Sequence, residues 1–363
     1  MKKFLAIMLS AVMAVGLAVG CGGGEDNDQD STAAEETTAA EETEADAADD
    51  ADAPAPAPDA AATDDAVADS LGEVKADGSY KIGFTISARD QFLSAMEAAA
   101  DDQAKAMGVE MTVVDANNNA NTQIQNVQTF ASQGVDAIIV NLVNSDNMEQ
   151  IMSSAGDIPV VFVNRKPSGE LEAGKATYVG SDENNSGRYQ GEFLAEYFND
   201  KGQEEVDVVL LEGILGLQHT ILRTESAKKA LEDNGIKANY IYQDTAEFDR
   251  AKAQNKMQTF LGTNQSFDCV IANNDEMALG AIEAMKSAGL DPQEIPVVGI
   301  DATPAGLTAM ENGELMFTVF QNPVGQGAGA VRAAVLFANG EDVDTVVDIP
   351  FEPVSMDNYK DYM

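Results

Sequence analysis

The 363-residue chain has few of the residues on which disulfide frameworks and much of catalysis depend: two cysteines and one histidine, His219. Its 21 Lys and Arg residues stand against 62 Asp and Glu, a formal net charge of −41. Without a basic patch to neutralise phosphates, nucleic acid is excluded as a partner. No Gly-x-Ser-x-Gly motif and no cluster of metal-ligand residues accompanies the histidine. The sequence therefore predicts no enzyme, metal or cofactor.

The N-terminus is typical of an exported protein. A positive start at residues 1–3 (MKK) precedes an apolar run over residues 4–19 and small residues before Cys21. This is the layout of a secretory signal, and the run is shorter than the ~20 apolar residues of a membrane span. Residues 17–21 (LAVGC) resemble the bacterial lipobox, with the Leu one place further from the Cys than usual. The resemblance implies a signal over 1–20 and lipidation of Cys21; an ordinary signal with an incidental Cys is the alternative.

The segment after Cys21 differs in composition from the rest of the chain. Residues 22–77 repeat Ala, Glu, Asp and Thr, include APAPAP at 53–58, and contain no aromatic residue. Such a segment buries too little apolar surface to offset chain entropy, and its like charges extend it. We predict that residues 21–77 form a disordered, acidic Ala/Pro-rich tether. With Cys21 lipidated, Cys269 has no partner, and its apolar surroundings predict a buried thiol.

From residue 78 the chain alternates short apolar runs with helix-like segments. We expect strands at 81–86, 109–114, 137–140 and 160–163, and again at 206–211, 238–242, 268–272 and 296–300. Helices are expected between them at 92–107, 122–133, 186–199, 223–234, 249–261 and 277–288. This rhythm predicts an α/β fold with two similar doubly wound parallel-sheet lobes. Ligands of such sheets bind beyond the carboxyl ends of the strands, so the cleft between the lobes is the expected site.

Polar side chains stand where the expected strands end. Asp90, Asn141, Asn164, Asn274 and Asp301 all follow apolar runs. Each alone is equally compatible with a turn or a helix cap. Together, planar polar groups that pair with vicinal hydroxyls, beside aromatic residues that stack on a sugar ring, predict a site for a polyol.

At these residues the chain resembles the periplasmic-type binding proteins for galactose/glucose and for ribose, from about residue 80 to 359. The most specific stretches are residues 272–280 (ANNDEMALG) and 298–304 (VGIDATP). The resemblance implies a sugar-binding protein that serves an ABC transporter. The ligand-binding residues that it implies are Asp90, Phe92, Asn141, Asn164, Arg165, Arg223, Phe248, Asn274, Asp301 and Gln321.

The implied site mixes features of the two types. The galactose type carries a His and an Asp where this chain has Leu217 and His219, and its acidic calcium loop is absent at residues 199–203. Galactose itself is therefore disfavoured, and no calcium is expected. We interpret His219 as a surface or loop residue rather than a ligand contact. Ribose, a hexose and a cyclitol such as inositol remain open.

By the same resemblance the chain crosses between lobes three times, joined by a three-strand hinge. The N-terminal lobe is expected to comprise 78–181 plus 322–349, and the C-terminal lobe 182–321 plus 350–363. The expected partners are a monosaccharide and the permease and ATPase subunits of an importer. We expect a monomer outside the cell, on the outer face of the membrane through its lipid alone.

Two other classes of function compete with transport. The same fold could present a sugar or cyclitol to a chemoreceptor or sensor kinase, and the sequence does not separate these roles. A glycosidase would use Asp90 and Asp301 as paired carboxylates, which we disfavour. Related repressors begin with a helix-turn-helix, whereas this chain begins with a signal and an acidic tether.

Overall fold

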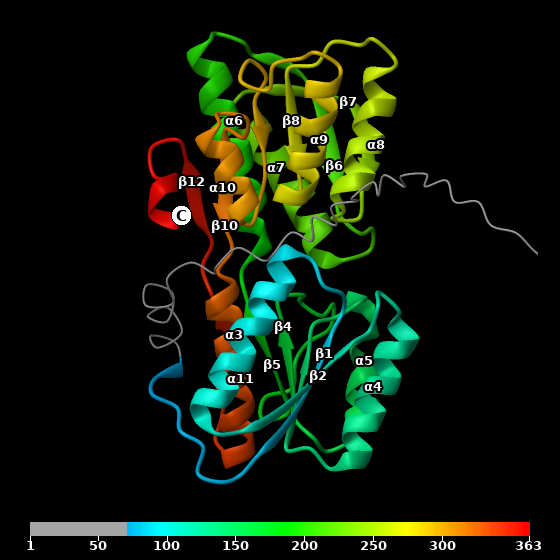
Figure 1. Cartoon of the computed structure of the whole chain (residues 1–363), viewed down its shortest axis with the longest axis vertical. Coiled ribbons are helices and arrows are strands. Elements are labelled where there is room, and N and C mark those ends of the chain that lie inside the picture. The colour runs from blue at the N-terminus through cyan, green and yellow to red at the C-terminus, as the bar shows by residue number, and fades with distance from the viewer. Residues whose placement is uncertain (1–70) are drawn as a thin grey trace, which may run out of the picture. The chain divides into compact units, whose positions relative to one another are not determined.

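The computed structural model describes residues 71–363; the predicted signal, Cys21 and the predicted tether as far as residue 70 lie outside the described residues. In the described part, helices alternate with the strands of two six-stranded sheets (Figure 1). The predicted fold class, α/β with two doubly wound and mostly parallel sheets, is confirmed.

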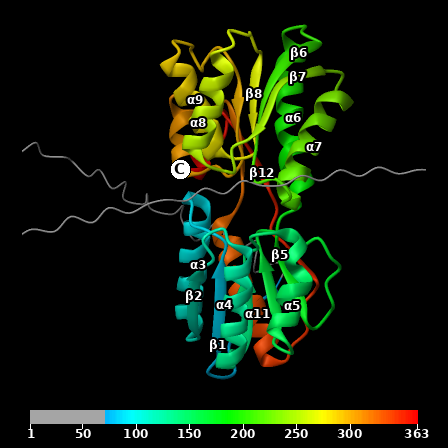
Figure 2. The ribbon, with the colours of Figure 1, turned by 90° about the vertical axis from the view of Figure 1, so that its right-hand side faces the viewer.

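The first sheet is entirely parallel, in the order β11-β5-β4-β3-β1-β2. Its strands are β1 (Lys81–Ile86), β2 (Glu110–Asp115), β3 (Ala137–Val140), β4 (Val160–Val163), β5 (Ala176–Gly180) and β11 (Val346–Asp348). One face is covered by α3 (Gln91–Met107) and α11 (Pro323–Asn339), the other by α4 (Ala120–Gln133) and α5 (Met148–Ala155) (Figures 1 and 2). A short 3-10 helix, η1 (Ser145–Asn147), precedes α5.

The second sheet repeats this plan, in the order β12-β10-β9-β8-β6-β7. Its strands are β6 (Glu205–Glu212), β7 (Lys237–Thr245), β8 (Cys269–Ala272), β9 (Val297–Val298), β10 (Phe317–Phe320) and β12 (Glu352–Ser355), of which β12 alone runs antiparallel to its neighbour. One face carries α6 (Glu183–Asp200) and α7 (Gln218–Asp233). The other carries α8 (Arg250–Leu261), α9 (Asp275–Ser287) and α10 (Pro304–Glu311), and η2 (Tyr359–Tyr362) follows β12.

Strands covered on both faces explain the unbroken apolar runs in the sequence. Ile139 of β3 packs into the cluster of α3 and α11, while its neighbours Ile138 and Val140 pack into that of α4 and α5. In β8, Val270 and Cys269 divide in the same way between the two faces. A strand without polar alternation is expected where both faces are buried. Cys269 is fully buried, as predicted, and burial raises the pKa of its thiol.

The chain passes between the sheets three times. It leaves the first sheet after β5, returns after β10, and leaves again after β11 to form β12 (Figure 1). We call the connecting residues 181–182, 321–322 and 349–351 the three crossing segments. The strands β5 and β10 lead into these segments and run parallel to β1, β3, β6 and β8, so the carboxyl ends of all these strands lie on this side, where doubly wound sheets bind ligands.

Helix ends follow local signals where these are present. The Asp90 carboxylate accepts a hydrogen bond from Leu93 N at 2.7 Å and begins α3, and Gly108, with φ of 69°, ends it. These are the usual N-cap and left-handed C-cap. By contrast, α7 begins at Gln218 rather than at the predicted residue 223. Its N-cap, Leu217, makes no side-chain capping bond, so the sequence lacks a start signal there.

The predicted tether is too long at its C-terminal end. Leu71, Val74 and Ala76 pack against the core formed by α3 and α11. Asn339 Nδ2 donates to Lys75 O at 2.9 Å, which fixes the backbone of this segment. Residues 71–77 therefore pack against the helices of the first sheet instead of belonging to a tether. None of the helices described is long and apolar enough to cross a membrane.

The contact between α3 and α11 depends on Gly327. A methyl group there would lie 2.2 Å from Met96 O, so Gly327→Ala should force the helices apart. We expect a loss of about 1–3 kcal/mol in the free energy of unfolding, measured by urea denaturation. Gly262→Ala is the matched control, because its methyl would meet nothing closer than 3.4 Å and its φ of −62° suits Ala. Equal stability of the two variants would contradict this account.

Candidate ligand-binding site

A pocket lies where strand ends of both sheets meet. Its cavity volume is about 30 Å³, room for one or two water molecules, so its walls lie close together in this structure. Its walls come from both sides of the crossing segments. They are formed by Asp90, Phe92, Leu93, Asn164 and Arg165 of the first lobe, and by His219, Arg223, Phe248, Asn274, Asp301 and Gln321 of the second.

Nine of the ten residues predicted from the sequence line this one pocket; Asn141 does not. Asn141 is fully buried behind it, at the end of β3. Its Oδ1 accepts from Ser87 Oγ at 2.6 Å, and its Nδ2 donates to Asn164 Oδ1 at 3.2 Å. The structure thus makes Asn141 a support for Asn164, because its own polar atoms are bonded within the protein.

The interpretation of His219 as a surface or loop residue is wrong. His219 is buried in the first turn of α7 and lines the pocket. Its ring stacks on Phe248, with centroids 5.3 Å apart and an interplanar angle of 22°, and its Nδ1 is buried without a hydrogen-bond partner. The error follows from the missed helix start. Once α7 begins at Gln218, His219 and Arg223 are four residues apart on one helix face.

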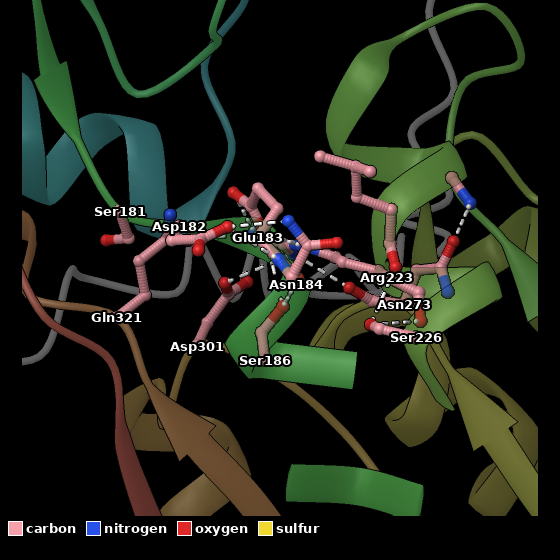
Figure 3. A network of polar contacts seen from close by, with 12 residues as sticks. Ser181, Asp182, Glu183, Asn184, Ser186, Arg223, Ser226, Asn273, Asp301 and Gln321 are labelled. Atoms are coloured by element: carbon pink, nitrogen blue, oxygen red, sulfur yellow. Dashed lines mark hydrogen bonds and ion pairs between the residues drawn. The ribbon is translucent and has the colours of Figure 1, made fainter. Parts of the chain in front are cut away.

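Arg223 is the centre of a buried polar network (Figure 3). Its Nε donates to Glu183 Oε2 at 2.7 Å and its Nη2 to Glu183 Oε1 at 3.2 Å. Nη1 donates to Asn273 O at 2.8 Å, and Nη2 to Gln321 Oε1 at 3.3 Å. Burial opposes the charge of Arg223, but Glu183, with smaller contributions from Asp301 and Tyr178, outweighs it, so the pKa of Arg223 lies above its ordinary value.

Arg165 is equally buried but has fewer partners. Its Nη1 donates to Leu142 O at 2.9 Å, and no carboxylate of residues 71–363 lies within ion-pair distance of its guanidinium. Burial, reinforced by the positive charge of Arg223, lowers the pKa of Arg165 to about 10, against an opposing effect of Asp90. Arg165 still carries its proton at neutral pH and brings several N–H donors to the pocket wall.

Two carboxyl groups face these cations. Burial raises the pKa of Asp90, while its bond from Leu93 N opposes the rise. Burial also raises the pKa of Asp301 well above its usual value, although Arg223 Nη1 lies 3.9 Å from its Oδ1. Asp301 has a φ of 123°, a conformation that non-glycine residues rarely adopt and that functional sites retain.

The pocket therefore offers a small ligand both donors and acceptors. Guanidinium and amide N–H groups donate, carboxyl oxygens accept, and the Gln321 Nε2 is buried without a partner. The rings of Phe92, Phe248 and His219 supply apolar faces. This combination suits a compact ring that carries several hydroxyl groups. Among the described residues, no group of His, Cys, Asp and Glu is placed to hold a metal ion.

Comparison with known proteins places this site in a family. The periplasmic binding protein domain matches residues 82–342. A putative rhizopine-binding protein of Rhizobium meliloti is 37% identical over 279 residues, 75% of this chain and 89% of that protein. A D-galactose/methyl-galactoside binding periplasmic protein of Haemophilus influenzae is 32% identical, over 82% of this chain and 96% of that protein.

A solved structure agrees with these sequence matches. An ABC transporter solute binding protein from Bacillus halodurans, with bound myo-inositol, superposes with a TM-score of 0.73 at 39% identity, over 78% of this chain and 97% of that one. The chain therefore belongs to the periplasmic binding protein family, among the sugar-binding proteins with the two-lobed type I fold.

The buried state of His219 predicts a pH dependence of stability. Burial first, and then the charges of Arg223 and Arg165, lower its pKa well below 6.5. As the pH falls below about 6.5, the unfolded chain binds a proton that the folded chain excludes, so folding stability falls. Relative to His219→Gln, the wild type should lose up to about 1.4 kcal/mol of folding stability per pH unit. This loss is expected at pH values between the pKa of His219 in the folded chain and that in the unfolded chain.

Urea unfolding of both proteins at about pH 7.5 and about pH 5 measures this difference. At about pH 7.5, the difference in the free energy of unfolding between the two proteins reports packing. The change in that difference between about pH 7.5 and about pH 5 reports the titration of His219. No other histidine contributes, since His219 is the only one in the chain. Parallel pH profiles for the two proteins would contradict the buried neutral imidazole.

Proposed function

We propose that this protein captures a monosaccharide or a cyclitol between its two lobes and delivers it to an ABC importer. The observation that carries the proposal is the pocket itself, in which Arg165, Asp90 and Asp301 present unpaired hydrogen-bonding capacity beside the Phe248 ring. A charge-assisted hydrogen bond contributes about 1.5–3 kcal/mol. Three or four of these with one stacked ring are consistent with a micromolar affinity, about 8 kcal/mol, after ordering costs.

The relatives narrow the class of ligand. Proteins named for rhizopine and for galactose, and one solved with bound myo-inositol, all match this chain over at least three quarters of its length. Leu217 and His219 replace the His and Asp of the galactose type, which weighs against galactose. A polyhydroxylated six-membered ring, a cyclitol or a hexose other than galactose, is the ligand that we favour, with ribose as the smaller alternative.

We propose lobes of 78–181 plus 322–349 and of 182–321 plus 350–363, with residues 71–77 added to the first. The ligand would be enclosed by a hinge motion at the crossing segments. A hydrogen bond between the two proposed lobes, outside the crossing segments, supports a closed conformation. Gln218 N, at the start of α7, donates to Ser145 Oγ of η1 at 3.3 Å.

A panel of neutral polyols tests the function. Calorimetric titration with myo-inositol, glucose, galactose and ribose should find binding for at least one of them, and binding to none would overturn the proposal. Arg165→Met should then weaken binding by about a hundred-fold or more, since it removes charge-assisted bonds. Arg188→Met is the matched control, because Arg188 pairs with Glu192 on the exposed side of α6. Equal losses in both variants would mean that the pocket is misassigned.

We further propose that Cys21 carries a lipid that holds the mature protein on the outer face of the membrane as a monomer. The acidic segment would then keep the lobes near the importer and raise their effective concentration there. Cys21→Ser should move the protein from the membrane fraction to the soluble fraction in the producing cell and abolish incorporation of a labelled fatty acid. Cys269→Ser controls for thiol loss, because Cys269 is fully buried. Membrane association that survives Cys21→Ser would refute the anchor.

A further inference from the structure

Arg223 contacts all three crossing segments or the residues that flank them. Its Nε and Nη2 bind Glu183, the first residue of α6 and the one that follows the first crossing segment. Nη2 also binds Gln321, at the start of the second crossing segment. Its Cζ lies 5.9 Å from the ring centroid of Phe351, at the end of the third. A single side chain of the pocket wall thus lies beside the second-lobe end of every connection between the sheets. Figure 3 shows Arg223 with Glu183 and Gln321.

Glu183 is placed to fix this arrangement. Its side chain is 3% exposed, and both its carboxylate oxygens contact Arg223, in the paired geometry that gives the strongest ion-pair hydrogen bonds. Ser186 Oγ donates to Glu183 Oε2 at 3.2 Å, which leaves the carboxylate little freedom to turn. The first turn of a helix also favours a negative charge. Glu183 does not line the pocket, so it acts on a ligand only through Arg223.

We propose that Glu183 is a positioning residue that couples occupancy of the pocket to the hinge. It holds Arg223 at the pocket wall and, through Arg223, ties the first crossing segment to the other two. A ligand can shift an equilibrium between open and closed lobes only by its different affinity for the two states. The partners of Arg223 stand at the second-lobe ends of the three crossing segments, so a change in the direction of these segments during hinge motion alters its contacts and supplies such a difference.

This coupling rests on the proposed function for the ligand contact of Arg223, but the tie between the crossing segments does not require a ligand. Glu183→Gln keeps the shape and the hydrogen-bonding oxygen of the side chain and removes its charge. The matched control is Glu192→Gln on the same helix, where Glu192 forms an exposed ion pair with Arg188. Surface pairs of this kind contribute little.

Paired labels on the full-length chain report the hinge. Exposed Ser132 on α4 and Thr259 on α8 are replaced by Cys for labelling, in a Cys21→Ser background, while Cys269 stays buried and unreactive. The distance distribution between the labels is measured without ligand and with saturating myo-inositol, or with whichever panel sugar binds the wild type. Affinity is measured by calorimetry on the same proteins.

We expect Glu183→Gln to weaken affinity about ten-fold or more and to broaden the distance distribution even without ligand. Glu192→Gln should behave as the wild type. Glu183→Asp retains the charge at a shorter reach and should fall between the wild type and Glu183→Gln; it replaces Glu183→Gln in the comparison if that variant does not fold. A purely structural role would lower the unfolding midpoint of Glu183→Gln and leave both readouts unchanged.

The two proposals fail separately. If the wild type binds a sugar and Glu183→Gln binds it equally well with the same distance distribution, the coupling is overturned and the proposed function stands. If the wild type binds no polyol, the proposed function fails. The distribution without ligand then still decides whether Glu183 ties the crossing segments.

Discussion

A buried guanidinium requires a partner for its charge and acceptors for its N–H groups, and Arg223 obtains them from parts of the chain that are far apart in sequence. Glu183 supplies the charge, Asn273 a backbone oxygen at the end of β8, and Gln321 a side-chain oxygen after β10. The net stability of such a pair is small, but removing one partner leaves an uncompensated charge in the interior. The strand ends around Arg223 are therefore arranged so that its charge has a partner and its N–H groups have acceptors.

The two guanidinium groups of the pocket differ in a way that matters for binding. The second lobe satisfies Arg223 almost completely. The first lobe gives Arg165 one acceptor, Leu142 O, and no carboxylate within ion-pair distance among the described residues. Donors without acceptors in a buried site are costly. Under the proposed function, a ligand with several oxygen atoms would accept from Arg165 between the lobes and so stabilise the closed arrangement more than the open one.

The sequence was sufficient to predict much of this architecture because its strands are buried on both faces. The unbroken apolar runs at residues 137–140 and 160–163 indicated parallel sheets, and the polar residues that follow such runs indicated the pocket. The sequence was insufficient where the deciding contacts are not local. His219 was misread because nothing near Leu217 marks the start of α7. Asn141 has the residue type of a ligand contact, but Ser87 and Asn164 occupy its polar atoms.

The identity of residue 219 explains how the pocket differs electrostatically from the galactose type, which has an acid there. Asp90 and Asp301 already face the pocket with raised pKa values, and a third buried carboxyl group at this wall would add its own cost of desolvation, which the nearby charges of Arg223 and Arg165 would oppose. A neutral imidazole supplies a polar atom without that cost, and its ring extends the flat surface of Phe248. The wall formed by His219 and Phe248 therefore differs from the rest of the pocket, because it presents shape and one unpaired polar atom, Nδ1, rather than charge.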